Sequence, residues 1–157
     1  MKRELFTIQG NDKLTENVFK LTLCGDTAAI TASGQFVNIE LEGLYLRRPI
    51  SVCDLNGDSL ALIYKVVGKG TELMSAMNKG ETLNVLVGLG NGYDTSKSGS
   101  APVLIGGGVG VPPLYLLAKT LIGEGKRPRV ILGFNTAKEI FLEEEFLALG
   151  IEVLVTT

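Results

Sequence analysis

The hydrophobic pattern of the chain changes its period near residue 95, and this change limits the folds that the sequence can adopt. Before residue 95 apolar residues alternate with polar ones, as in Phe19, Leu21 and Leu23. A two-residue period places every second side chain on one face of a β-strand. Six short runs of this kind, separated by Gly, Asn and Asp turns, predict an antiparallel barrel or sandwich. The runs are Leu5–Ile8, Phe19–Leu23, Val37–Leu41, Ile50–Cys53, Leu60–Tyr64 and Leu83–Val87, with one helix predicted at Thr71–Asn78.

After the polar segment Tyr93–Pro102, which is typical of a linker, short apolar strands alternate with helical patterns. This β-α-β-α-β order predicts the start of a doubly wound parallel sheet. Three strands and two helices make roughly half of a usual nucleotide-binding domain. We therefore expect a C-terminally truncated or split chain with two domains, residues 1–98 and 99–157. The predicted elements are Val103–Ile105, Pro112–Ile122, Val130–Leu132, a helix opened by a Thr136–Glu139 capping box and stopped by Gly150, and Ile151–Val155.

Composition excludes several classes of function. The net charge of −2 and the pI near 5.2 disfavour nucleic acid or an anionic membrane surface as the main partner. No apolar stretch is long enough for a membrane span, and the first residues lack a secretory signal, so a cytoplasmic location is expected. With no histidine and only Cys24 and Cys53, the chain has no Ser-His-Asp site and no four-ligand iron–sulfur site. We predict no catalytic acid or base and no metal site.

A glycine-rich turn, Gly106-Gly107-Gly108-Val109-Gly110, joins one predicted strand to the helix that follows it. Glycines allow backbone N–H groups to face a pyrophosphate, and a helix N-terminus adds about half a positive charge. The spacing departs from the G-x-G-x-x-G fingerprint of dinucleotide-binding proteins. An ordinary tight turn between strand and helix is the alternative interpretation.

A second glycine turn, Gly68-Lys69-Gly70-Thr71, also opens a predicted helix. Arg47-Arg48-Pro49 adds guanidinium groups that are suited to bidentate phosphate binding. The alternatives are a solvated lysine and a surface ion pair. Two such turns indicate two nucleotide ligands or one long dinucleotide.

Five motifs together resemble the ferredoxin–NADP reductase-like flavoproteins and, among them, the electron-transfer subunits of type B dihydroorotate dehydrogenase. The similarity runs in the right order along essentially the whole chain. The motifs are RRPIS (Arg47–Ser51), IYKVVGKGT (Ile63–Thr71), LGNGY (Leu89–Tyr93), GGGVGVPPL (Gly106–Leu114) and LGFNTAKEIFLEEE (Leu132–Glu145).

The resemblance implies a six-stranded FAD-binding β-barrel followed by an incomplete NAD-binding α/β domain. Electrons would pass from NADH through FAD, and in the full-length subunit through a [2Fe–2S] cluster, to or from a dihydroorotate dehydrogenase catalytic subunit in pyrimidine biosynthesis. The implied assembly is a heterotetramer. The residues that match the family's cofactor-binding positions are Arg48, Pro49, Ile50, Ser51, Ile63, Tyr64, Lys65, Gly70, Thr71, Gly106, Gly107, Gly108, Val109 and Gly110.

Within that set, the resemblance assigns Arg48 and the helix start at Gly70 to the FAD pyrophosphate, and Ser51 to the N5 edge of the flavin. Ile50 stands where many relatives have tyrosine, which predicts an aliphatic contact in place of aromatic stacking. Val87-Gly88 replaces a Gly-Pro pair before Leu89, and the family's four-cysteine segment is absent. A stand-alone NAD(P)H:flavin oxidoreductase and a non-catalytic flavin- or nucleotide-binding module remain alternative functions.

Overall fold

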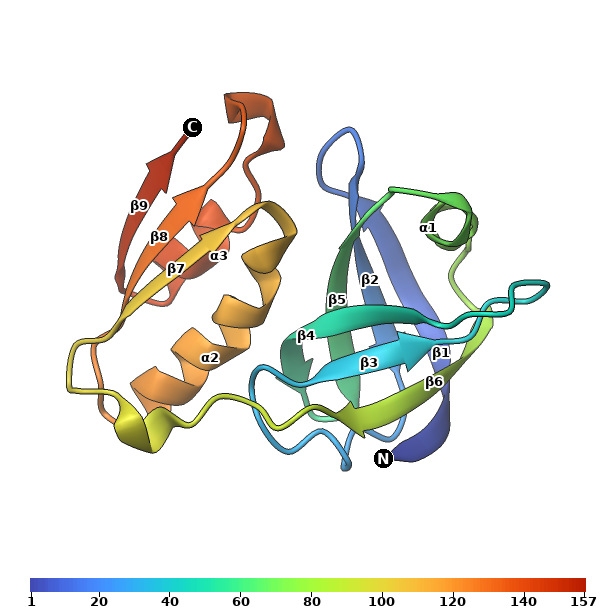
Figure 1. The fold of residues 1–157 in the computed structure, drawn as a ribbon, viewed down its shortest axis with the longest axis horizontal. Coiled ribbons are helices and arrows are strands. Elements are labelled where there is room, and N and C mark those ends of the chain that lie inside the picture. Colours follow the sequence, from blue (N-terminus) through green and yellow to red (C-terminus); the bar gives the residue numbers. More distant parts are fainter.

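The computed structural model describes residues 1–157 and divides them into a closed six-stranded barrel and a smaller α/β part (Figure 1). None of its helices has the length and apolar character needed to cross a membrane. The barrel contains β1 (Lys2–Lys13), β2 (Val18–Cys24), β3 (Phe36–Ile39), β4 (Arg48–Asn56), β5 (Ser59–Lys65), α1 (Lys69–Ser75) and β6 (Thr82–Leu89). The α/β part contains β7 (Val103–Gly107), α2 (Pro112–Gly123), β8 (Arg129–Gly133), α3 (Glu143–Ala148) and β9 (Glu152–Thr156).

The barrel closes because the apolar side chains of all six strands turn toward one interior. Its strand order is β1-β2-β5-β4-β3-β6, and every neighbouring pair is antiparallel. The alternation of buried residues confirms the predicted two-residue period, and the closed ring of strands shows that the architecture is a barrel and not a sandwich. The fully buried interior includes Phe6, Ile8, Leu23, Val37, Ile39, Val52, Leu60, Leu62, Tyr64, Val85 and Val87.

The α/β part is a parallel sheet in the order β7-β8-β9, as the alternating pattern predicts. Helix α2 lies between this sheet and the barrel (Figure 1). Buried residues of both parts form one apolar cluster, in which Cys53 and Ile63 of the barrel join Leu114 and Leu117 of α2. The opposite face of the sheet is exposed and carries Val103, Ile105 and Leu154.

The predicted single helix from Thr136 to Gly150 is wrong. Thr136 Oγ1 donates to Glu139 Oε1 at 3.1 Å instead of capping the backbone, and the chain makes only a short 3₁₀ turn there. Leu142 then adopts φ 66°, the left-handed region, immediately before α3 begins. Phe141 and Leu142 are both buried in the apolar cluster between the two parts. Burial of these two side chains outweighs the local preference for a continuous helix.

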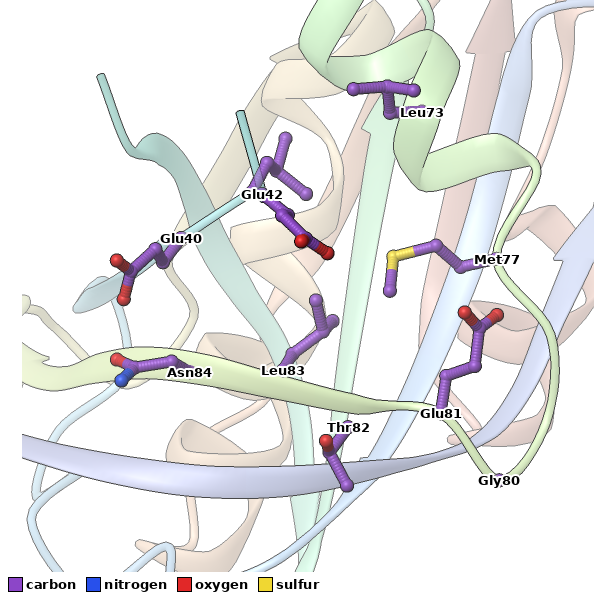
Figure 2. A pocket seen from close by; sticks show the side chains of 10 residues that line it. Glu40, Glu42, Leu73, Met77, Gly80, Glu81, Thr82, Leu83 and Asn84 are labelled. Carbon is purple, nitrogen blue, oxygen red and sulfur yellow. The ribbon is translucent and has the colours of Figure 1, made fainter. Parts of the chain in front are cut away.

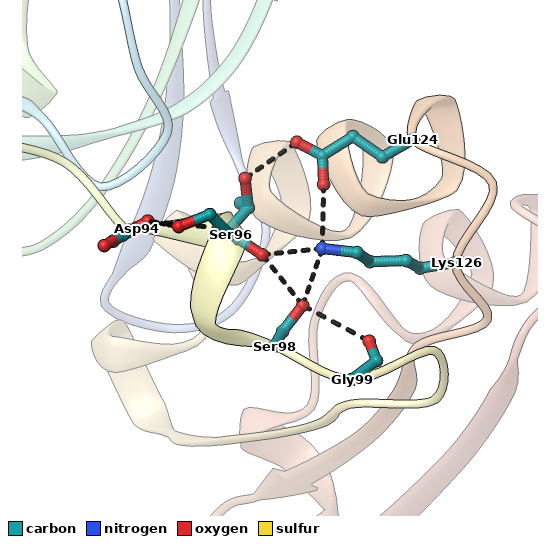
Figure 3. A network of polar contacts seen from close by, with 7 residues as sticks. Asp94, Ser96, Ser98, Gly99, Glu124 and Lys126 are labelled. Carbon is teal, nitrogen blue, oxygen red and sulfur yellow. Dashed lines mark hydrogen bonds and ion pairs between the residues drawn. The ribbon is translucent and has the colours of Figure 1, made fainter.

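The segment of residues 90–102 between the two parts is fastened to the end of α2 (Figure 3). Lys126 Nζ donates to the Thr95 carbonyl at 2.6 Å and to Ser98 Oγ at 2.9 Å. Thr95 Oγ1 donates to Glu124 Oε1 at 2.7 Å, and this bond, with help from Lys126, lowers the pKa of Glu124. The proposed domain boundary after residue 98 falls inside this fastened segment.

Replacing Lys126 with methionine should release the segment. The variant loses two charge-assisted hydrogen bonds, which costs about 1 kcal/mol of local stability and raises the opened fraction roughly fivefold. Limited proteolysis should then cut between residues 93 and 102 about five times faster than in the wild type. Lys97→Met is the matched control, because Lys97 lies in the same segment but its side chain is 83% exposed. Equal cutting rates in the two variants would contradict the assignment.

Candidate functional site

Strands β4 and β5 pair with each other along only part of their lengths. The ladder joins Val52–Asn56 to Ser59–Leu62. Beyond it, residues 48–51 pair only with β3, and residues 63–65 pair only with β2. The backbone edges that these two segments would use for each other are therefore free. We call this region, residues 48–51 and 63–65, the β4–β5 opening; it lies at the α1 end of the barrel (Figure 1).

Arg48 lies across the start of α1, next to Gly70. A Cβ on Gly70 would be 2.7 Å from the guanidinium carbon of Arg48, so no larger residue fits without displacing that side chain. Arg48 Nη1 also donates to the Leu46 carbonyl. The fold thus brings together two residues that the family resemblance assigns to one phosphate site.

Arg47 has a different environment from its neighbour. Its Nη2 donates to Glu40 Oε2 at 2.8 Å and to Asn84 Oδ1 at 3.0 Å, and its Nη1 donates to the Asn38 and Asn84 carbonyls at 3.3 Å. All of these contacts tie β3 and its following loop to β6. Arg47 is therefore a structural residue, and Arg48 is the arginine beside the opening.

Thr71 caps α1 with its side chain. Its Oγ1 accepts the N–H groups of Val67 at 2.9 Å and Gly68 at 3.2 Å, and donates to the Gly68 carbonyl at 3.0 Å. The hydroxyl is thus fully used inside the protein. Only the main chain of Thr71 could contact a ligand.

Among residues 63–65, only Lys65 presents its side chain outward. Tyr64 is buried in the barrel, and its hydroxyl donates to Asn11 Oδ1 at 3.0 Å. Burial raises the pKa of Tyr64 to about 12. Ile63 is buried in the cluster between the two parts. Ile63 and Tyr64 can therefore serve a ligand through their backbone groups only.

Among the β4 residues of the opening, Pro49 is the most exposed. Pro49 is exposed, whereas Ile50 and Ser51 are half-buried. The Ile50 side chain packs against the barrel core, across from Val37 on β3. The aliphatic side chain of Ile50 therefore holds this part of β4 against the barrel core.

The glycine turn after β7 contains glycines of two kinds. A Cβ on Gly106 would be 2.7 Å from Leu114 Cδ1, so this glycine permits close packing of strand and helix. Gly108 has φ +52° and, like Gly110, has open space where a Cβ would stand. The N–H groups of Gly108, Val109 and Gly110 make none of the turn, loop or cap hydrogen bonds. These N–H groups are therefore available to an anion.

A cavity of about 540 Å³ lies at the junction of the two parts and unites residues from both. Lys65 of the barrel and the glycine turn both line it. Glu139 also lines it, although the sequence pattern indicated only a helix-capping role for this residue. An acidic residue after the second strand of a nucleotide-binding fold is a known signal for ribose binding and could have identified it. The lining residues are Val18, Lys65, Gly107, Gly108, Val109, Gly133, Phe134, Asn135, Glu139 and Phe141.

The largest cavity lies elsewhere, between the loop after β3, the end of α1 and the start of β6 (Figure 2). It has a volume of about 860 Å³, and Glu40, Glu42 and Glu81 line it. Three carboxylates disfavour a pyrophosphate. The junction cavity is therefore the better candidate for a nucleotide.

No group of three or more His, Cys, Asp or Glu side chains comes together in a way that could hold a metal ion. Both cysteines are free thiols. Burial raises the pKa of Cys53 to about 12, and a hydrogen bond to Asp58 raises that of Cys24. Neither thiol is activated as a nucleophile, since activation requires a lowered pKa.

Comparison with known proteins gives one consistent result. The chain is 39% identical to the dihydroorotate dehydrogenase B (NAD(+)) electron transfer subunit of Bacillus pumilus, over 99% of this chain and 64% of that protein. It is 40% identical to the same subunit of Geobacillus sp., with the same coverage. The chain thus spans 64% of the length of these relatives. No protein-family profile matches the sequence.

Solved structures share the arrangement of barrel and sheet. The NADH-dependent reduced ferredoxin-NADP oxidoreductase, studied for flavin-based electron bifurcation, superposes with a TM-score of 0.84 at 30% identity, over 96% of this chain and 55% of that one. Phthalate dioxygenase reductase superposes with a TM-score of 0.82 at 17% identity, over 97% of this chain and 50% of that one, which supports the fold alone. The fold is therefore that of the ferredoxin reductase-like flavoproteins. Along 99% of its length, this chain is similar to the dihydroorotate dehydrogenase B electron transfer subunits.

Proposed function

We propose that this chain binds FAD at the β4–β5 opening and a nicotinamide nucleotide at the junction cavity, and that it carries electrons between them. The single observation that carries this proposal is the junction cavity, where Lys65 of the opening and the glycine turn line the same space. Electron transfer between two cofactors requires this adjacency. The names of the relatives support the same function.

The residues at the opening suit FAD. Bound FAD would supply the redox chemistry, accepting a hydride from the reduced nicotinamide. The guanidinium of Arg48 and the main chain at Gly70 and Thr71 would hold the pyrophosphate. The free backbone edges of residues 48–51 and 63–65 would hydrogen-bond the ring system, with Ser51 at its reactive edge. No side-chain acid or base is needed, because the chemistry belongs to the cofactors.

The nicotinamide nucleotide would bind with its pyrophosphate at Gly107–Gly110 and its ribose beside Glu139. Free N–H groups in the turn support the first contact. The place of Glu139 in the same cavity supports the second, since a carboxylate accepts hydrogen bonds from ribose hydroxyls. We propose NADH as the natural nucleotide.

The partner is proposed from the relatives, whose name describes one subunit of a larger enzyme. We propose that the chain delivers electrons to or from a dihydroorotate dehydrogenase catalytic subunit in pyrimidine biosynthesis, within a heterotetramer. A cytoplasmic location and a [2Fe–2S] cluster in the full-length subunit are part of the same proposal.

Replacing Arg48 with alanine should weaken FAD binding. The loss of a charge-assisted contact to the pyrophosphate costs about 1.5–3 kcal/mol, roughly a 10- to 150-fold higher Kd. Titration of FAD into the apoprotein measures this. Arg47→Ala is the matched control: it should lower the Tm, because Arg47 ties β3 to β6, and leave the Kd of FAD within about threefold. An unchanged Kd in Arg48→Ala would remove this residue from the site.

NADH should reduce the FAD-loaded protein at least tenfold more efficiently than NADPH, as judged by kcat/KM. Residues 134–137 contain no arginine to bind a 2′-phosphate, and the Glu139 carboxylate repels one. The substitution Glu139→Gln should reduce the preference for NADH over NADPH. Glu144 is exposed, and Glu144→Gln should leave this preference unchanged. Comparable kcat/KM values for both nucleotides in the wild type would contradict this prediction.

The polypeptide of 157 residues should bind no [2Fe–2S] cluster. Such a cluster needs four ligands, and the sequence contains two cysteines and no histidine. Iron and acid-labile sulfide assays on protein purified anaerobically should find essentially none. A stoichiometric cluster in this polypeptide would contradict the ligand count.

A further inference from the structure

We propose that the ion pair between Asp54 and Lys119 is a positioning device that fixes the angle between the barrel and the α/β part, and so holds the two cofactor sites in register. This inference rests on the function proposed above. Lys119 Nζ lies 2.6 Å from Asp54 Oδ1. Of the seven ion pairs in the structure, this one alone joins a barrel strand to the α/β part.

The two residues stand on the elements that carry the two sites. Asp54 follows Ser51 by three positions on β4, just after the irregularity in the β4–β5 ladder at Val52. Lys119 lies on α2, the helix that the glycine turn opens. A rotation of α2 on β4 would therefore move the junction cavity relative to the β4–β5 opening. The ion pair opposes that rotation directly.

Both partners are held in place by further contacts. Asp54 Oδ1 also accepts the N–H of Leu55 at 2.9 Å, which orients the carboxylate. Lys119 Nζ lies 5.7 Å from the ring centroid of Tyr115, within the range of a cation–π contact. Tyr115 in turn packs edge-on against Phe146 of α3, with the ring centroids 5.3 Å apart. A continuous set of directional contacts thus runs from β4 through α2 to α3.

The rest of this interface gives little orientation of its own. Between β4 and α2 it consists mainly of apolar side chains, among them Cys53 and Leu117. The free energy of apolar burial is non-directional, and the Asp54–Lys119 pair is the one polar side-chain contact between a barrel strand and α2. The side chains of Lys119 and Asp54 are 35% and 26% exposed, and pairs of such exposure contribute little to stability. Orientation is therefore the property that the pair should control.

Residual dipolar couplings of backbone amides test the proposal without any cofactor. In the wild type, alignment tensors fitted separately to the barrel and to the α/β part should coincide. In Lys119→Met and Asp54→Asn the two tensors should differ in magnitude or direction, and the charge-swapped double variant (Asp54→Lys with Lys119→Asp) should restore agreement. Lys2→Met is the matched control, because Lys2 forms its ion pairs within the barrel region. Coinciding tensors in both single variants would overturn the proposal.

A second measurement uses FAD-loaded protein mixed rapidly with NADH. The single variants should bleach the flavin about tenfold more slowly at saturating NADH, because small misplacements of reacting groups have large effects on rate. The Kd of FAD should stay within about twofold of the wild-type value. If the wild type itself is not reduced, the proposed function fails, and the dipolar couplings still decide the positioning role. Equal bleaching rates in wild type and variants would contradict that role.

Discussion

The partial separation of β4 from β5 is the feature on which the rest of the structure depends. A barrel gains from pairing every strand along its full length, since each free N–H and C=O must otherwise find another partner. Here the ladder ends at Val52 and Leu62, and both strands continue for three or four residues without each other. Arg48 and Gly70 meet at the end of this opening, and the junction cavity begins at Lys65 beside it. The proposed backbone contacts of residues 48–51 and 63–65 follow from that interrupted ladder.

Much of this arrangement could be predicted from the sequence, because it depends on local patterns. Alternating apolar residues predicted the barrel strands, and the change of period predicted the parallel sheet. The glycine turns stand where strands or loops meet helices, as expected. The two prolines at the start of α2 also agree with the predicted helix, since the first helical turn needs no N–H donors from them.

Contacts between distant residues could not be predicted in this way. The partner of the buried Tyr64 hydroxyl is Asn11, 53 positions away, and the Asp54–Lys119 pair spans 65 positions. The family resemblance assigned Tyr64 and Thr71 to a ligand site, and both side chains are engaged within the protein. The helix expected after Thr136 failed for a similar reason. The helix was predicted from neighbouring residues alone, whereas the burial of Phe141 and Leu142 depends on residues of the barrel.

The fastening of the segment around Thr95 to α2 also determines where the molecule can bend. Because Thr95 and Ser98 are hydrogen-bonded to Lys126, they are structurally part of the α/β part. The stretch from Gly90 to Tyr93 belongs to the barrel, because Gln35 Nε2 donates to the Gly90 carbonyl at 2.9 Å and the Tyr93 N–H donates to the Ser33 carbonyl at 2.8 Å. The Tyr93 ring also lies against Gly34, where a Cβ would come within 2.6 Å of it. Only the chain around Asp94 separates the two sets of contacts, so the connection leaves the two parts almost no slack.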